Sequence, residues 1–308
     1  MVGAVNRTGQ LWKGLAFVSP LLLGFTVFTV YPVAASFYYS FCDFDIISPA
    51  RPVGLANYAA LLEDERFSRS LWNTAVFTVF AVPATMLTAL ALAFLLNMKL
   101  RGQALYRTIF FLPSIVPLVA SSVLWLWLLN PDYGLLNTAL RPLLDVLNAL
   151  AGTDFRPPGW LVDPNWTKPA LVIMSAWGVG GSMILYLAAL GDVPVTLYEA
   201  AQIDGAGPWR RAWHITLPMI SPVLFFTLIM GLIGTLQYFS QAWVMTPNGQ
   251  PGDATLFYAL YLFANAFLYL RMGYASAQAW ILFVVIVLAT VFVFRTTRRF
   301  VYYGGEGV

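Results

Sequence analysis

The chain has few charged residues for its length. Its 308 residues include 17 Lys and Arg and 14 Asp and Glu, which together make 10% of the chain. Soluble globular proteins carry about 25% charged residues, because a surface that faces water needs them. Apolar and aromatic residues make up 59% of this chain. The composition excludes a soluble enzyme and a disordered protein, and it leaves a polytopic membrane protein.

Cysteine and histidine are almost absent as well. Cys42 is the sole cysteine, so the chain cannot form an internal disulfide, and His214 is the sole histidine. No group of His, Cys and carboxylate residues has the spacing of a metal or catalytic site, which disfavours a membrane enzyme. The sequence contains no Gly-x-x-x-x-Gly-Lys-Ser/Thr motif for ATP. We therefore expect no catalytic residue, metal or cofactor on this chain, and any driving energy must come from another subunit.

Long apolar runs lie between the charged residues of the sequence. A membrane helix needs about 20 consecutive apolar residues, and six charge-free stretches of roughly this size occur. Continuous runs predict helices, whereas strands of a membrane barrel would alternate. The chain is thus predicted to be all-α, a single transmembrane domain over 1–308 with six spans. The predicted spans are 14–41, 70–98, 108–130, 169–191, 218–245 and 272–294.

The charges all lie in the connecting segments. With the N-terminus in the cytoplasm, the inner segments hold ten basic and four acidic residues, whereas the outer segments hold seven basic and ten acidic ones. The positive-inside rule then predicts that both termini are cytoplasmic. The inner bases are Arg7, Lys13, Lys99, Arg101, Arg107, Arg210, Arg211, Arg295, Arg298 and Arg299, and the inner acids are Asp192, Glu199, Asp204 and Glu306.

The spans themselves contain no charged side chain. Proton-coupled transporters usually need ionisable groups inside the membrane, so proton coupling is disfavoured. Sodium coupling through backbone carbonyls remains open. Two features of the predicted spans concern shape: Pro113 and Pro117 predict a kink in the third span, and Gly178, Gly180 and Gly181 favour local unwinding of the fourth.

Two connecting segments have a helical pattern. In the long outer segment, residues 135–150 place apolar side chains at helical spacing, which is typical of a helix on a membrane surface. The inner segment 192–213 predicts two short helices. Pro194 suits the first turn of one, with Asp192 or Thr196 as its cap, and Gly205 or Gly207 suits a left-handed end. Pro208 suits the first turn of the second helix, which leads into the fifth span.

The inner segment also carries a motif. Glu199-Ala200-Ala201-x-x-Asp204-Gly205-Ala206, followed by Ile215-Thr216-Leu217-Pro218, resembles the E-A-A loop of the permeases of ATP-binding-cassette (ABC) importers. Further similarities to that family cover nearly the whole chain. They are Gly54-Leu55-x-Asn57-Tyr58, Asn73-Thr74, Trp160-Leu161, Trp177, Leu187-Ala188, Leu190, Ala264-x-x-Phe267 and Gly273-Tyr274-Ala275.

The resemblance is to carbohydrate-uptake permeases of the maltose-transporter kind or their glycerol-3-phosphate relatives. It implies a type I importer architecture in a bacterial or archaeal cytoplasmic membrane. It also implies that this chain forms half of a pore with a second permease, and that a binding protein outside the membrane delivers the solute. The loop would dock on a cytoplasmic ATPase dimer, which binds ATP and Mg. The implied coupling residues are Glu199, Ala200, Ala201, Asp204, Gly205 and Ala206.

The solute pathway is predicted on the fourth and fifth spans. Met174, Trp177, Gly178 and Gly181 share one face of a continuous helix, as do Gly231, Gly234, Thr235 and Tyr238, with Gln237 and Gln241 adjacent. The resemblance supports both regions, because sugar permeases line their cavity from these helices. Close helix packing through small residues is nevertheless the favoured interpretation of any single glycine here.

The chemistry of these spans favours a neutral sugar or polyol. Aromatic faces, amides and hydroxyls suit such solutes, whereas a phosphate needs a cation that no span offers. Two alternatives remain open at this point: a stand-alone secondary transporter or channel for a small polar solute, and glycerol-3-phosphate as the importer's substrate.

Overall fold

The computed structural model describes residues 7–98, 101–297 and 302. Four of the predicted inner residues, Lys99, Arg298, Arg299 and Glu306, lie outside the described residues. Four continuous helical segments in the described part are long and apolar enough to cross a membrane. The first is residues 12–39, which lie within α1 (Arg7–Phe25), η1 (Thr26–Val30) and α2 (Tyr31–Ser40). The second is α4 (Glu65–Asn97), and the fourth is α15 (Met272–Thr297). The third is residues 208–245, which comprise α11 (Pro208–Arg211), η3 (Ala212–Thr216), α12 (Leu217–Leu236) and α13 (Ser240–Met245).

Two further segments qualify as bent helix pairs. The first consists of α5 (Gln103–Phe111) and η2 (Leu112–Ile115), followed after a bend of 100° by α6 (Leu118–Leu128). The second joins α8 (Pro164–Trp177) to α9 (Gly180–Gly191) at 50°. With each pair counted as one span, the described chain has six, and the fold is helical as predicted.

The bends have local causes. Pro113 and Pro117 cannot donate a backbone hydrogen bond, and Pro117 takes an extended ψ of 137° just before α6, so the predicted kink is confirmed. Gly178 and Val179 leave the helical path between α8 and α9. The helices also extend past the charge-free stretches, so that charged residues such as Arg66 and Arg295 lie in their end turns.

The remaining elements are short. The helical ones are α3 (Ala56–Glu63), α7 (Leu135–Ala151), α10 (Val195–Ile203), the 3-10 turn η4 (Pro247–Gly249), α14 (Tyr258–Phe263) and the π-helix η5 (Ala264–Leu268), and the strands β1 (Cys42–Asp43) and β2 (Arg51–Pro52) form an antiparallel pair. The helix predicted over 135–150 is confirmed as α7.

The chain divides into two compact units, and the first comprises residues 1–64 and 262–282. In its described part, Asn57 Nδ2 donates to the carbonyl oxygens of Ser40 and Cys42, at 3.0 and 2.9 Å. Tyr274 donates its hydroxyl to Asp64 at 2.5 Å. A Cβ atom at Gly273 would collide with the Cys42 carbonyl, so this position requires glycine. These contacts join the end of the first span to the start of the sixth.

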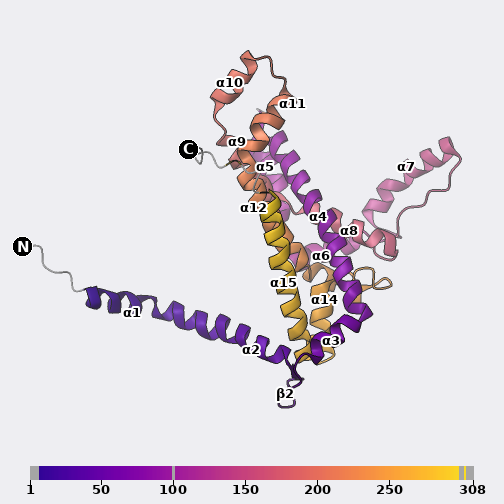
Figure 1. The fold of residues 1–308 in the computed structure, drawn as a ribbon. Coiled ribbons are helices and arrows are strands. Elements are labelled where there is room, and N and C mark those ends of the chain that lie inside the picture. Colours follow the sequence, from indigo (N-terminus) through magenta and orange to yellow (C-terminus); the bar gives the residue numbers. More distant parts are fainter. Residues whose placement is uncertain (1–6, 99–100, 298–301, 303–308) are drawn as a thin grey trace, which may run out of the picture. The chain divides into compact units, whose positions relative to one another are not determined.

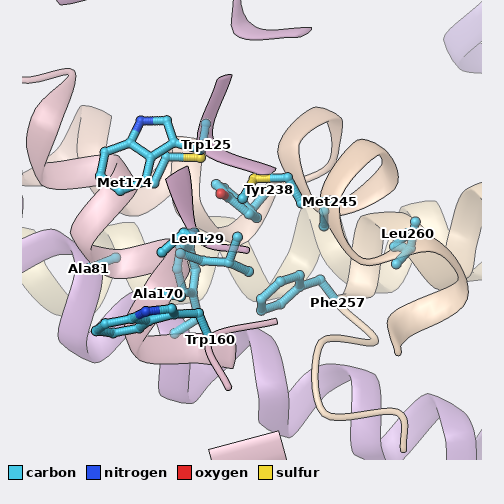
Figure 2. Packing of buried hydrophobic residues seen from close by; sticks show 13 residues of the cluster. Ala81, Trp125, Leu129, Trp160, Ala170, Met174, Tyr238, Met245, Phe257 and Leu260 are labelled. Carbon is cyan, nitrogen blue, oxygen red and sulfur yellow. The ribbon is translucent and has the colours of Figure 1, made fainter. Parts of the chain in front are cut away.

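The second unit comprises residues 65–261 and 283–308, and α4 runs through its centre against α8, α9 and α12 (Figure 1). Ala81, Ala89 and Ala93 of α4 are fully buried, because small side chains let helix backbones approach closely in a membrane. One cluster of buried apolar residues surrounds Phe77, Trp125 and Tyr238 (Figure 2). A second surrounds Met183, Tyr186 and Ile220.

A polar network holds the loop after α13 on the start of α4. Asp253 pairs with Arg66 at 3.0 Å, and Asn73 Nδ2 donates to the carbonyl oxygens of Asp253 and Leu256, at 2.8 and 3.2 Å. The Tyr258 backbone N–H donates to Thr74 Oγ1 at 2.8 Å. Because buried backbone groups need partners, Asn73 and Thr74 fix the path of this loop.

Candidate functional site: the α10–α11 loop and the broken spans

The motif Glu199–Ala206 forms the end of α10 and the turn that follows it. Gly205 has φ +74°, and the N–H of Ala206 donates back to the Ala201 carbonyl at 2.8 Å, which closes the helix. The left-handed end at Gly205 is thus confirmed, whereas Gly207 is extended. Pro208 begins α11, as predicted.

The predicted start of this helix is wrong in detail. Pro194 lies at the N-cap instead of within the first turn, and neither Asp192 nor Thr196 makes a side-chain cap bond there. The reason is that Asp192 already ends α9 as its C-cap. Sequence spacing alone does not separate a residue that ends one helix from one that begins the next.

The surface of α10 and α11 is exposed. Glu199, Ala200, Asp204 and Gly205 are all exposed, and Ala201 and Ala206 are partly so. Large apolar side chains accompany them: Ile203 of α10 is 87% exposed, Trp209 of α11 81%, and Trp213 of the adjoining η3 65%. Exposed apolar groups that lie among charges mark interaction sites. Arg210 and Arg211 supply the positive charges beside the two tryptophans.

One side chain of α10 joins this surface to the membrane helices. The hydroxyl groups of Tyr198 and Thr216 lie 3.0 Å apart. Thr216 is 4% exposed and belongs to the π-helix η3, and Tyr198 packs against the second apolar cluster. Single π-helical turns occur often at functional sites. The helix that carries the motif therefore has a direct hydrogen-bonded connection, one residue before the motif, to the helix that becomes the fifth span.

The fourth span does not present the predicted face. Met174, Trp177, Gly178 and Gly181 would share a face only on a continuous helix, but α8 ends at Trp177 and α9 begins at Gly180. Met174 is buried, whereas Trp177 is 38% exposed, and Gly178 and Gly181 are exposed. The expected unwinding occurs at Gly178 and Val179, whereas Gly181 is already inside α9, and the bend between the two helices separates Met174 from Gly181.

The fifth span also departs from the predicted face. α12 ends at Leu236, so Tyr238 lies beyond it and packs between Phe77 and Phe257, at centroid distances of 4.5 and 5.4 Å. Thr235 donates its hydroxyl to the Gly231 carbonyl at 2.9 Å and is therefore occupied within its own helix. Gln237 is exposed and Gln241 is partly exposed.

The structure brings together residues from three spans. Trp125 of α6 meets Trp177 edge to face at 5.9 Å, and Trp125, Met174 and Tyr238 belong to one cluster (Figure 2). Trp125 is 6% exposed, so this side chain packs inside the cluster. Within the described part of the chain, Trp125 Nε1 makes no hydrogen bond. The sequence offered no signal for this pairing, because residues 125 and 177 lie on different spans.

The fold and the loop thus define the class of protein: a polytopic helical membrane subunit with an exposed motif loop. Residues 66–302 match the family model described as the binding-protein-dependent transport system inner membrane component, and the chain belongs to this family. Membership makes it a transport permease, and it excludes the stand-alone transporter or channel and the membrane enzyme.

Similar proteins support the assignment along nearly the whole chain. The probable ABC transporter permease protein YesP of Bacillus subtilis is 37% identical over 94% of this chain and 92% of its own length. The lactose transport system permease protein LacF of Rhizobium radiobacter is 35% identical over 93% and 94%. A chain of a bacterial ABC transporter that imports the acidic polysaccharide alginate has the same fold, with TM-score 0.79 and 24% identity over 94% and 99% of the two chains.

Proposed function

We propose that this chain forms half of the translocation pore of a sugar importer and couples it to a cytoplasmic ATPase dimer. The exposed α10–α11 surface, which is tied to η3 by the Tyr198–Thr216 contact, carries the proposal. Glu199 and Asp204 would meet polar or basic groups of the ATPase, with Ala200, Ala201 and Ala206 leaving room for its cleft and Gly205 making the turn. A second, related permease would supply the other half of the pore.

The proposal also includes the nucleotide, the orientation of the chain and the delivery of the solute. ATP and Mg bind the ATPase subunits, both termini of this chain lie in the cytoplasm, and an extracytoplasmic binding protein delivers the solute. ATP-driven closure of the ATPase pair would move α10 and the attached spans between inward-open and outward-open arrangements. Such a change needs different contacts in the two states. The hydrogen bond between Tyr198 and Thr216 would transmit the movement of α10 to the fifth span.

A neutral sugar or polyol is the proposed solute. Relatives are named for the transport of lactose, arabinooligosaccharides and diacetylchitobiose, which are neutral. Another relative is named for sulfoquinovosyl glycerol, whose sulfonate is anionic. The charge-free spans favour neutral solutes. One relative, the permease protein UgpA of Agrobacterium fabrum, is named for sn-glycerol-3-phosphate, but a phosphate group calls for Arg or Lys beside it.

The proposed pathway runs past the break between α8 and α9. Trp177, which is 38% exposed and meets Trp125, would stack on a sugar ring, and Gln237 and Gln241 would bond the hydroxyl groups of the sugar. Met174, Tyr238 and Thr235 would shape the wall. Gly178 and Gly181 are exposed and would leave space at the break, and Gly231 lies against the Val82 side chain.

Charge reversal of the motif tests the coupling. In proteoliposomes that hold the full importer, we expect Glu199→Lys to abolish solute-stimulated ATP hydrolysis while the chain still inserts and folds. Asp192→Lys is the matched control, because Asp192 is also exposed but ends α9, where a cation suits the helix dipole. Full stimulation in Glu199→Lys would refute the proposed docking. Uptake of lactose and of glycerol-3-phosphate by the same vesicles separates the two solute classes.

A further inference from the structure

The helix α7 has two sharply different faces. At 100° per residue, its apolar side chains occupy about half of the circumference, and its polar side chains occupy a narrower arc on the other side. The apolar face consists of Leu135, Leu136, Ala139, Leu140, Leu143, Leu144, Val146, Leu147 and Leu150, and the polar face of Asn137, Thr138, Arg141, Asp145 and Asn148.

Only the first turns of this apolar face pack against other residues of the second unit. Leu136 and Leu140 pack against the cluster around Trp125, and Asn137 is buried. Beyond them α7 extends away from α6 and α8 as an arm (Figure 1). Leu143 is 63% and Leu150 81% exposed. An apolar face of this length requires a cover.

The base of the arm is fixed. Trp160 Nε1 donates to Asn137 Oδ1 at 2.8 Å, and Asn137 Nδ2 donates to the carbonyl oxygens of Pro131 and Pro158, at 3.1 Å each. These bonds join both chain segments that enter and leave the arm. The helix is therefore held at a set place beside the spans that flank it.

The polar face and the tip satisfy themselves. Gly152 has φ +65° and ends the helix, Asn148 bonds both the N–H and the carbonyl of Phe155, at 2.9 and 3.0 Å, and Arg156 pairs with Asp154 at 3.0 Å. The positive charge of Arg141 and the negative charge of Asp145 cancel in the net charge of the helix. The arm thus has no net charge with which to attract a charged protein surface, and its attraction is apolar.

Chain connectivity keeps the arm at the membrane edge. α6 and α8 are each half of a membrane-crossing pair, and only six residues separate the end of α6 at Leu128 from the start of α7 at Leu135. Such a link reaches about 25 Å at most. The fourth span then crosses to the α10–α11 loop, so α7 belongs to the opposite side of the membrane from that loop.

We propose that α7 lies in the headgroup region of the bilayer on that side, with its apolar face in the acyl chains and Arg141 and Asp145 in water. A wide apolar face, a polar strip and a position beside spanning helices are what interfacial helices show. The lipid surface that covers the spans continues under the arm, so no additional partner is needed. This inference depends on the membrane location alone and is independent of the solute and of ATPase docking.

Site-specific labels test it. In the full chain with Cys42→Ser, single cysteines at Val146, Leu150, Arg141 and Asp145 would carry an environment-sensitive fluorophore in phosphatidylcholine and phosphatidylglycerol vesicles. We expect acyl-chain nitroxide lipids to quench positions 146 and 150 at least twofold more than positions 141 and 145, and aqueous iodide to show the reverse order. The two polar-face positions are matched controls on the same helix.

Three outcomes would overturn the proposal. They are iodide quenching of all four positions, shielding of 146 and 150 from both quenchers, and protection that begins only when the extracytoplasmic binding protein is added. The last two would show that protein covers the face. A second measurement needs no variant: a photoactivatable lipid should label peptides from residues 143–150 of the unmodified chain, and absence of that label contradicts a lipid contact.

Discussion

The hydroxyl groups of Tyr198 and Thr216 lie 3.0 Å apart and join the motif helix α10 to the π-helix η3 at the start of the fifth span. All but one of the other α10 residues around Tyr198 are exposed. In the proposed docking, a force applied to Glu199 by the ATPase would reach the membrane helices in part through this hydrogen bond.

Removal of this hydrogen bond should loosen coupling. We expect Tyr198→Phe or Thr216→Val to lower the solute transported per ATP hydrolysed several-fold, because a hydrogen bond of about 1 kcal/mol is lost. The double variant should be no worse than either single one, since both remove the same contact. Thr196→Val, on the exposed side of α10, is the control. An unchanged transport-to-hydrolysis ratio in both single variants would contradict this role.

The break between α8 and α9 should not tolerate a side chain at Gly180. A Cβ there would lie 2.8 Å from Phe111 Cα and 2.9 Å from the Phe110 carbonyl oxygen. We expect Gly180→Ala to lower the free energy of unfolding by about 1–3 kcal/mol, since these are backbone atoms. Gly181→Ala meets nothing within 4 Å and should be neutral or gain up to about 1 kcal/mol from helix propensity. Thermal unfolding in detergent compares them, and equal midpoints would refute the close packing.

The network at Asp253 should make a small, salt-sensitive contribution. Asp253 pairs with Arg66 at 3.0 Å, and both side chains are partly exposed. We expect Asp253→Ala to cost about 1 kcal/mol or less, and less again at high salt. Asp154→Ala breaks a far more exposed pair with Arg156 and should have no measurable effect. If the Asp253 variant unfolds at the wild-type temperature in low salt, the ion pair makes no measurable contribution to holding the loop.

Trp177 and Gln237 should matter for transport. Both are exposed near the breaks in the fourth and fifth spans. We expect the double change of both residues to Ala to reduce sugar uptake about tenfold, which corresponds to about 1.4 kcal/mol, while the midpoint of unfolding stays near that of the wild type. Leu288→Ala, at an exposed site on α15, is the control. Wild-type uptake by the double variant would remove both residues from the solute pathway.

The sequence predicts local features of the structure correctly. Apolar runs separated by charges predicted where the helices lie, because a charge is costly in a bilayer and an apolar run is not. Pro113 and Pro117 predicted the kink before α6, and Gly205 or Gly207 was the predicted left-handed end of α10, which is Gly205 in the structure. Each of these outcomes depends on a residue and its near neighbours in the chain.

Faces drawn on ideal helices were less reliable. Met174 and Gly181 were expected on one stripe, as were Gly231 and Tyr238, but each pair is separated where a helix ends. The pathway residues of the fourth and fifth spans therefore remain a proposal. A periodic pattern cannot show where a helix breaks when the break is stabilised by a neighbouring span, as Gly180 is by Phe111.

The sequence by itself determined that this chain is a six-span helical permease with an E-A-A loop, because both the partition of side chains into a membrane and the motif are local. Only the tertiary structure decided which distant residues meet: Tyr198 with Thr216, Trp125 with Trp177, and Asn73 with the backbone at Asp253. Such contacts depend on how separate helices pack, since the shape of a helix surface is completed by residues from elsewhere in the chain.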